Sequence, residues 1–200
     1  MDIQTWVRTT FNTTDPKLFL ELGANNGSDT SWMAGIPNVT IHAFEPDARV
    51  SFPSLPNVTL HRKAVGNFNG TTFFFPSEIN MATNKEWHFS SSIKKPKDHL
   101  IHHPITFGTT IAVEETTLDT FCESLGPIDF IWADIQGAEK EMIQGGPKTL
   151  AKTKFLYTEF SNEEMYEGQV GLQEILRMLG TYEIVELYPC DVLLKNQTIP

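Results

Sequence analysis

The stretch LFLELGANNGSDT, from Leu18 to Thr30, decides the fold of this 200-residue chain. An apolar run of strand length ends at Gly23, and a second glycine, Gly27, follows before a segment that suits a helix. Glycine allows a tight backbone turn and lets a ligand approach main-chain N–H groups without a Cβ in the way. The acid Glu21 stands just before this loop. The pattern therefore predicts a buried strand that leads into a ligand-binding turn.

Apolar runs of similar length recur along the chain, and most are continuous rather than alternating, which is typical of strands buried on both faces. They lie at 18–22, 40–44, 58–65, 128–135, 155–160 and 182–187. Between them, segments compatible with helices lie at 29–34, 117–124, 139–151 and 172–179, with Asp29 and Thr116 as candidate helix caps. This alternation predicts an α/β fold with a doubly wound, mainly parallel sheet and helices on both faces.

The loop sequence narrows the choice of ligand. A dinucleotide-binding loop reads G-x-G-x-x-G, whereas this loop reads G-A-N-N-G, so a pyrophosphate is disfavoured. Glu21 also disfavours a pyrophosphate, because a carboxylate repels a pyrophosphate but attracts a cationic or amino-bearing ligand. A second acid, Glu45, ends the next strand about 20 residues later, the spacing of an acid that binds ribose hydroxyls. S-adenosylmethionine fits best, because it combines an adenosine, an amino-acid tail and a sulfonium.

Length and composition limit the number of domains and the classes of partner that fit this chain. The length and a hydrophobic content of 40% suit a single domain over residues 1–200. No apolar run approaches the roughly 20 residues that span a bilayer, and no basic leader precedes one, so we expect a cytoplasmic protein without a membrane partner. A net charge of −10 disfavours nucleic acid as a partner. Cys122 and Cys190 lie far apart and are expected to be buried hydrophobes rather than a disulfide.

One region, at about 76–110, breaks the alternation. The stretch from Pro76 to Gly108 carries Pro, Ser, Lys and His with little periodicity, and it is longer than most connections in compact domains. We expect it to be an insertion over the mouth of the active site. Its histidines have no partner carboxylate at a diagnostic spacing, so no metal is predicted.

Several further motifs carry a resemblance to a known family. ELGANNGSDT, IHAFEPDA, VTLHRKAVGNFNGTTFF, the serines at 90–92, TTLDTFCESLGPIDFIWADIQGAEKEMIQGG and FLYTEF occur in the order and approximate spacing of the FkbM-type methyltransferases. The resemblance runs from about Leu18 to Phe160. It implies a Rossmann-like class I methyltransferase fold, with a seven-stranded sheet whose final antiparallel strand comes from the hairpin-like YEIVELYPCDVLLK. It also implies methyl transfer from S-adenosylmethionine to an oxygen, commonly a hydroxyl of a sugar or a metabolite.

The resemblance also assigns roles to individual residues. For the cofactor, it places Gly23 and Gly27 around the methionine portion, Glu21 and Asn25 near its polar tail, Glu45 and the following Pro46 at the ribose, and Ala64 and Val65, at the end of the third strand, beside the adenine. Asp134 falls at the tip of the fourth strand and faces the methionine end or the acceptor. Ser91 and Ser92, with the nearby His88, are the candidate substrate-binding residues of the insertion.

Two residues depart from the family pattern, which commonly reads Lys-Ile-Asp-x-Glu-Gly-Ala-Glu at the fourth strand. Here the cation is lost near Ala133, and Gln136 stands where an acid is usual, so Gln136 can hydrogen-bond but cannot act as a base. The candidate catalytic groups are therefore Asp134 and Glu159, or a histidine of the insertion. Glu139 opens a predicted helix, where the helix dipole already favours an acid.

The favoured function is an O-methyltransferase acting on a hydroxyl of a sugar, glycan or small metabolite. Two alternatives stay open: methylation of an RNA ribose or cap 2′-hydroxyl, and a module that binds S-adenosylmethionine without catalysis. The acidic composition disfavours the first alternative. The substitution at Gln136 keeps the second open. A nicotinamide oxidoreductase is disfavoured, because the dinucleotide loop is missing.

Overall fold

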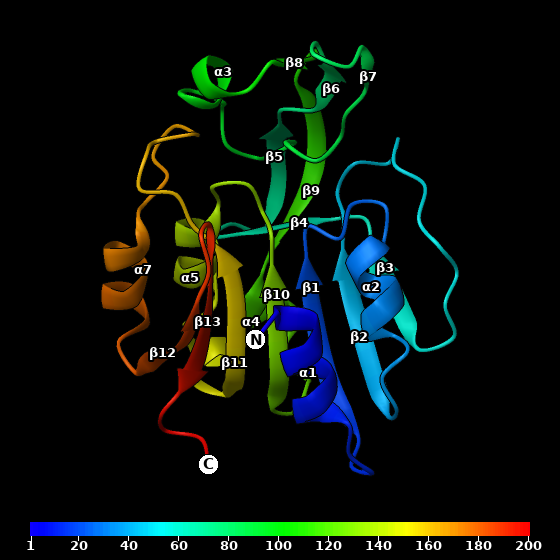
Figure 1. Ribbon diagram of the computed structural model, residues 1–200, viewed down its shortest axis with the longest axis vertical. Coiled ribbons are helices and arrows are strands. Elements are labelled where there is room, and N and C mark those ends of the chain that lie inside the picture. The colour runs from blue at the N-terminus through cyan, green and yellow to red at the C-terminus, as the bar shows by residue number, and fades with distance from the viewer.

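Strand β1 (Lys17–Leu22) is an interior strand of a seven-stranded sheet, between β10 and β2, in a computed structural model that describes residues 1–200 (Figure 1). The strand order is β12-β13-β11-β10-β1-β2-β3. The other members are β2 (Val39–Phe44), β3 (Val58–His61), β10 (Ile128–Ala133), β11 (Thr153–Glu159), β12 (Tyr182–Leu187) and β13 (Asp191–Asn196). Neighbouring strands from β3 to β11 run parallel, and β13 is antiparallel to both β11 and β12. The predicted sheet, with its closing hairpin, is confirmed.

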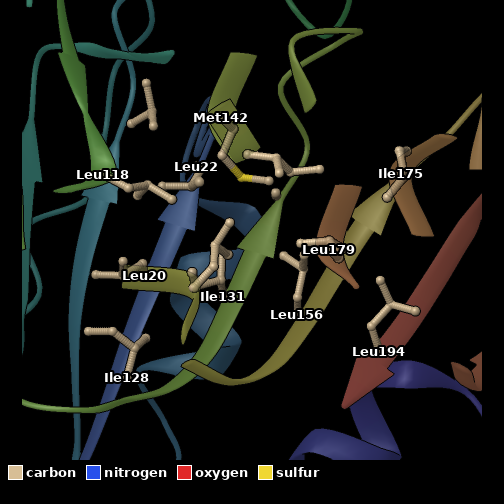
Figure 2. Close-up of a cluster of buried hydrophobic side chains, with 14 of the residues drawn as sticks. Leu20, Leu22, Leu118, Ile128, Ile131, Met142, Leu156, Ile175, Leu179 and Leu194 are labelled. Atoms are coloured by element: carbon tan, nitrogen blue, oxygen red, sulfur yellow. The ribbon is translucent and has the colours of Figure 1, made fainter. Parts of the chain in front are cut away.

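Helices cover both faces of this sheet, as predicted. The covering helices are α1 (Ile3–Phe11), α2 (Ser28–Met33), α4 (Leu118–Phe121), α5 (Glu139–Gly145), α6 (Pro147–Ala151) and α7 (Leu172–Leu179). Helix α3 (His99–His102) lies apart from them, above the sheet (Figure 1). On one face, Leu20 and Ile131 pack with Leu118, Met142 and Ile175 of the covering helices (Figure 2). On the other face, a second apolar cluster joins the sheet to α1 and α2. None of the helices has the length and apolar character needed to cross a bilayer.

Two small sheets lie above the carboxyl ends of the central strands (Figure 1). One contains β4 (Ala64–Gly66), β9 (Ile111–Thr117) and β5 (Gly70–Phe74). The other contains β7 (Lys85–Glu86), β6 (Ser77–Asn80) and β8 (Ile105–Phe107). This second sheet and α3 lie within the segment that sequence assigned to an insertion at 76–110. The segment therefore has secondary structure of its own, although its sequence shows little periodicity.

Several element boundaries differ from the prediction. The third strand expected at 58–65 is two strands, because Arg62 and Lys63 turn the chain away from the sheet edge. Ala64 and Val65 thus lie on β4, which pairs with β9, and not at the end of the third central strand. The helix expected at 139–151 is divided into α5 and α6 at Gly146, where Pro147 opens the second helix.

The helix caps also differ. Thr117, not Thr116, caps α4, since its hydroxyl accepts a hydrogen bond from the N–H of Thr120 at 3.1 Å. Gly27, not Asp29, precedes α2, and Asp29 lies in its first turn. Helix α1 has no counterpart in the prediction. It is capped by Asp2, which accepts a hydrogen bond from the N–H of Thr5.

Candidate functional site

A cavity with about 570 Å³ of empty space, including its open mouth, lies at the carboxyl ends of β1, β2 and β10. Ligands of doubly wound sheets bind at this end of the strands. We refer to it as the cofactor cavity. Of the residues that sequence assigned to cofactor and substrate, it is lined by Gly23, Asn25, Glu45, Pro46, Ala64, Val65, His88, Ser91, Ser92 and Asp134.

Gly23 brings the first loop into contact with the loop after β10. Its N–H donates to the carbonyl of Phe44 at 2.9 Å, and its φ of +81° is in the left-handed region. A Cβ at this position would lie 1.8 Å from the carbonyl oxygen of Asp134. Only glycine fits, so the predicted need for a glycine at the end of the first strand has a packing cause as well as a conformational one.

Glu45 holds this loop from the neighbouring strand. One of its carboxylate oxygens accepts a hydrogen bond from the N–H of Asn25 at 2.8 Å, and the other accepts one from the N–H of Asp47 at 2.7 Å. Burial raises the pKa of Glu45 to about 7, although both hydrogen bonds favour its ionised form. Each oxygen keeps a lone pair, so the carboxylate can still accept hydroxyl donors from the cavity.

Glu21 and Gly27 do not line this cavity. The carboxyl group of Glu21 is 1% exposed and lies behind the loop, where it pairs with the hydroxyl of Thr30. Burial raises the pKa of Glu21 to about 8, so this acid is largely protonated at neutral pH. Gly27 packs against Pro53 at the start of α2, on the far side of the loop. The structure therefore separates these two residues from the other predicted cofactor residues.

The insertion supplies one wall of the cofactor cavity. The side-chain amide of Asn25 donates to the carbonyl of His88 at 2.9 Å, which ties the insertion to the first loop. The hydroxyl of Ser91 donates to the same carbonyl at 3.1 Å, and that of Ser92 donates to the carbonyl of Gln136 at 2.7 Å. Both serine hydrogens are therefore used within the protein, and the oxygens of Ser91 and Ser92 already accept from the N–H groups of Ser77 and Lys94 at 3.0 and 2.9 Å. Each serine oxygen therefore keeps at most one further lone pair for a ligand.

A second, more open cleft with about 1600 Å³ of empty space adjoins the cofactor cavity, and we call it the acceptor cleft. Phe89, Asp134 and Gln136 line both spaces. Trp87 and Tyr166 add aromatic surface to the acceptor cleft, together with Phe160. Its wall also includes Glu159, Glu163 and several amide and hydroxyl side chains but no Lys or Arg.

Asp134 and Glu159 meet at the boundary between the two spaces through Gln136. The amide nitrogen of Gln136 donates to Asp134 at 2.6 Å and to Glu159 at 2.8 Å. Asp134 opens into the cleft but has protein on its other sides, and this desolvation raises its pKa. Burial, followed by the charge of Asp134, raises the pKa of Glu159 well above its ordinary value. With its pKa raised to about 10, Glu159 holds a proton at neutral pH beside the carboxyl group of Asp134.

Two other groups near this pair were not assigned a role from sequence. The hydroxyl of Tyr166 lies 3.0 Å from Oε1 of Gln136 and 2.9 Å from the carbonyl of Ser90, and donates its one hydrogen between them. Glu139 is buried at the start of α5, and burial raises its pKa to about 8. A favourable interaction with the helix dipole therefore does not by itself explain why an acid lies at this position. Tyr166 lies in a loop without periodicity, and no sequence signal linked it to Gln136.

Of the histidines in the insertion, His99 and His103 lie together in the wall of the acceptor cleft, with ring centroids 4.6 Å apart, whereas His88 and His102 lie elsewhere. His99 is buried, and desolvation lowers its pKa to about 4, so it is neutral at physiological pH. His102 pairs with Glu163 at 3.0 Å on the surface, and His88 lies 3.9 Å from Glu86. The structure contains no group of three or more His, Cys, Asp or Glu side chains arranged to hold a metal ion.

Comparison with known proteins identifies relatives. The family model described as "Methyltransferase FkbM domain" matches residues 21–186. The 2-O-methyltransferase NoeI of Sinorhizobium fredii (strain NBRC 101917 / NGR234) is 40% identical over 196 residues, which covers 91% of this chain and 80% of that protein.

The solved structures that match this chain have low sequence identity and TM-scores below 0.5. The precorrin-6y C5,15-methyltransferase from Geobacter metallireducens is 11% identical, with a TM-score of 0.45 over 96% of this chain and 88% of that one. The N-terminal domain of EvdMO1 with SAH bound is 14% identical, with a TM-score of 0.44 over 97% of this chain and 80% of that one. The extent of the family match and the identity to NoeI are decisive: this chain belongs to the FkbM family of S-adenosylmethionine-dependent methyltransferases.

Proposed function

We propose that this methyltransferase transfers the methyl group to an oxygen, and that its acceptor is a hydroxyl of a sugar, a glycan or a small metabolite. One observation carries the proposal: Asp134 lies where the cofactor cavity and the acceptor cleft meet, so a carboxylate is available where a hydroxyl would lose its proton. The relative NoeI is named as a 2-O-methyltransferase, which supports oxygen as the methylated atom.

The residues of the cofactor cavity fit S-adenosylmethionine. Glu45 offers two carboxylate oxygens to the ribose hydroxyls, and Pro46 follows on the same side. Ala64 and Val65 offer an apolar surface suited to a base, and Gly23 leaves backbone space beside Asp134. Asn25 extends the polar wall of the cavity. Bound there, the cofactor supplies a methyl group that its sulfonium has already activated.

Glu21 and Gly27 have an indirect role in this proposal. Glu21 fixes the strand end by pairing with Thr30, and Gly27 lets the loop turn into α2. Ser91, Ser92 and His88 come from the insertion and face the cofactor cavity. We propose that these three residues contact the bound ligands and that the 76–110 insertion closes over them within a single domain.

The acceptor cleft suits a sugar ring. Trp87 and Phe89 lie with their ring centroids 5.1 Å apart, and Phe89 is 48% exposed, so an apolar sugar face can stack on it. The amide and hydroxyl side chains of Asn80, Ser161 and Asn162 can pair with ring hydroxyls. The acidic wall disfavours RNA, whose phosphates require cations.

The chemistry asks the protein to align the acceptor oxygen with the methyl–sulfur bond and to take the hydroxyl proton as the new bond forms. Asp134 is the candidate that receives this proton or orients the hydroxyl, with Glu159 beside it. Removal of one positioned base typically costs about 10²–10⁴-fold in rate.

The test is transfer of a ¹³C-labelled methyl group from S-adenosylmethionine to a panel of neutral methyl glycosides and oligosaccharides, with the product site assigned by NMR. We expect an O-methyl signal on one ring hydroxyl, and a loss of about 10²-fold or more in kcat for Asp134→Asn with cofactor affinity retained. Asp98→Asn, on the insertion and not among the residues that line either space, is the matched control. An N-methyl or C-methyl product, or near-normal turnover by Asp134→Asn, contradicts the proposal.

A further inference from the structure

Gln136 has an unusual position in the molecule. Its φ of +51° is in the left-handed region, which a side chain other than Asn or Asp rarely adopts without support. Ser92 supplies that support by donating to the carbonyl of Gln136 at 2.7 Å. The turn directs the Gln136 side chain toward Glu159, 23 residues further along the chain, on the neighbouring strand.

The contacts of the Gln136 amide determine its orientation. An amide nitrogen carries two hydrogens, and here both have carboxyl partners, Asp134 at 2.6 Å and Glu159 at 2.8 Å. The opposite orientation would turn Oε1 toward the carboxylate of Asp134, where two acceptors repel each other. Oε1 instead faces the hydroxyl of Tyr166 at 3.0 Å, which is a donor.

No Lys or Arg lines the acceptor cleft beside the pair, where the basic side chains are His99 and His103. Lys63 of the cofactor cavity is paired with Glu114. Ionisable groups that face the pair from neighbouring elements are Glu139 at the start of α5, Asp191 on β13, Asp29 on α2, and the phenols of Tyr157 and Tyr166. All of these are acids, and the acceptor cleft has no Lys or Arg in its wall. The Gln136 amide is therefore a main source of positive potential at these carboxyl groups.

We propose that Gln136 is a positioning residue that holds Asp134 and Glu159 as one acid–base pair with a single shared proton, and that Tyr166 keeps its amide in the working orientation. The pair then carries one negative charge at the boundary between the cofactor cavity and the acceptor cleft. This inference rests on the proposed methyl transfer to a hydroxyl. It specifies which groups take up the hydroxyl proton and which residues hold those groups in place.

The proton balance of the step follows. The O–CH₃ bond forms as the S–CH₃ bond breaks, and the electron pair of the S–CH₃ bond stays on sulfur, which becomes neutral. The acceptor hydroxyl gives its proton to Asp134, so the pair becomes doubly protonated and uncharged. The pair then releases one proton to water before the next turnover. Neither a metal nor a redox partner is needed.

Carboxyl-¹³C NMR titration of the whole protein tests the pair without an acceptor. The variant Gln136→Leu removes both amide hydrogen bonds, and we expect the pKa of Asp134 to rise by about one to two pH units, because hydrogen bonds to a charged group favour that charge. Tyr166→Phe keeps the amide but frees its orientation, and we expect a smaller rise in the same direction. Gln144→Leu, an exposed position on α5, is the matched control and leaves the titration of Asp134 unchanged.

The same variants give a kinetic readout once an acceptor is in hand. In Gln136→Leu, we expect the acid limb of the pH profile of kcat to move to higher pH, by the same amount as the pKa measured by NMR. We expect kcat at neutral pH to fall at least about tenfold, while the KM for S-adenosylmethionine stays within about twofold. A purely structural role for Gln136 would change KM and stability without moving the limb.

The outcomes separate this inference from the proposed function. If Gln136→Leu leaves the titration of Asp134 and Glu159 as in the unmodified protein, or if Gln144→Leu moves it equally, the inference is overturned. If the titration shifts as expected but no hydroxyl compound accepts a methyl group, the proposed function fails while the carboxyl pair stands.

Discussion

Replacing Glu21 with Gln should remove the contribution of the Glu21 carboxyl group to the pH dependence of folding stability. Glu21 lies on the central strand, is 1% exposed, and has Thr30 as its side-chain hydrogen-bond partner. Burial raises its pKa from an ordinary 4.5 to about 8. A group whose pKa is raised on folding stabilises the fold fully below its unfolded pKa, and that contribution is lost as pH rises through the folded pKa.

The magnitude follows from these two pKa values. At about 1.4 kcal/mol per pH unit, the raised pKa corresponds to an upper limit of about 5 kcal/mol, of which about 4 kcal/mol is lost between pH 5 and pH 9. The variant Glu21→Gln carries a neutral amide of similar size and does not titrate. Its free energy of unfolding relative to the unmodified protein should therefore increase by about 4 kcal/mol from pH 5 to pH 9.

The assay is urea unfolding, followed by circular dichroism, at pH 5, 7 and 9. Glu45, Glu139 and Glu159 also have raised pKa values, but they are present in both proteins and cancel in the difference. Glu183→Gln, an exposed position on β12, is the matched control and should run parallel to the unmodified protein. Parallel curves for Glu21→Gln, with a constant difference between pH 5 and pH 9, would refute the reasoning.

Three further predictions concern the two cavities. Affinity for S-adenosylmethionine should weaken as pH falls below about 7, where Glu45 gains a proton and loses acceptor capacity, and calorimetric titration of Glu45→Gln should show weak binding without this pH dependence. Gly23→Ala should destabilise the fold by about 2 kcal/mol or more, since its Cβ meets the backbone of Asp134 at a positive φ. The control Gly126→Ala, with nothing within 4 Å, should change stability by less than about 1 kcal/mol in thermal unfolding, and an equal loss in both would count against the packing argument. Trp87→Ala should raise the KM for a glycoside acceptor several-fold with little change in cofactor affinity. An unchanged KM would show that the sugar does not stack on this aromatic surface.

The fold was predictable because its buried strands have a strong signal. The run at Leu18–Leu22 is continuous, since both sheet faces are covered, and the same holds for 128–133 and 155–159. Helix α1 was missed, although Ile3, Val7 and Phe11 recur every four residues after a capping Asp2. The break after β3 was missed because apolar residues lie on both sides of the polar residues at 61–63, so the pattern predicts one strand over 58–65.

The site was predictable where residues follow directly after a strand. Glu45 and Asp134 end parallel neighbours of β1, so their position at one edge of the sheet follows from the strand order. The interior position of Glu21 did not follow, because a strand-end acid can face either the loop or the helix that covers the sheet. The contact between Tyr166 and Gln136 joins segments 30 residues apart, and sequence alone does not show how those segments pack.

The measurement that tests the central claim most directly is the assignment of the methylated atom. The protein is incubated with S-adenosylmethionine carrying a ¹³C-methyl group and with the glycoside panel, and the product is analysed by heteronuclear NMR. The account predicts one new O-methyl group on a ring hydroxyl, lost with Asp134→Asn and retained with Asp98→Asn. A label on nitrogen or carbon, or an O-methyl product that Asp134→Asn forms at the unmodified rate, would contradict it.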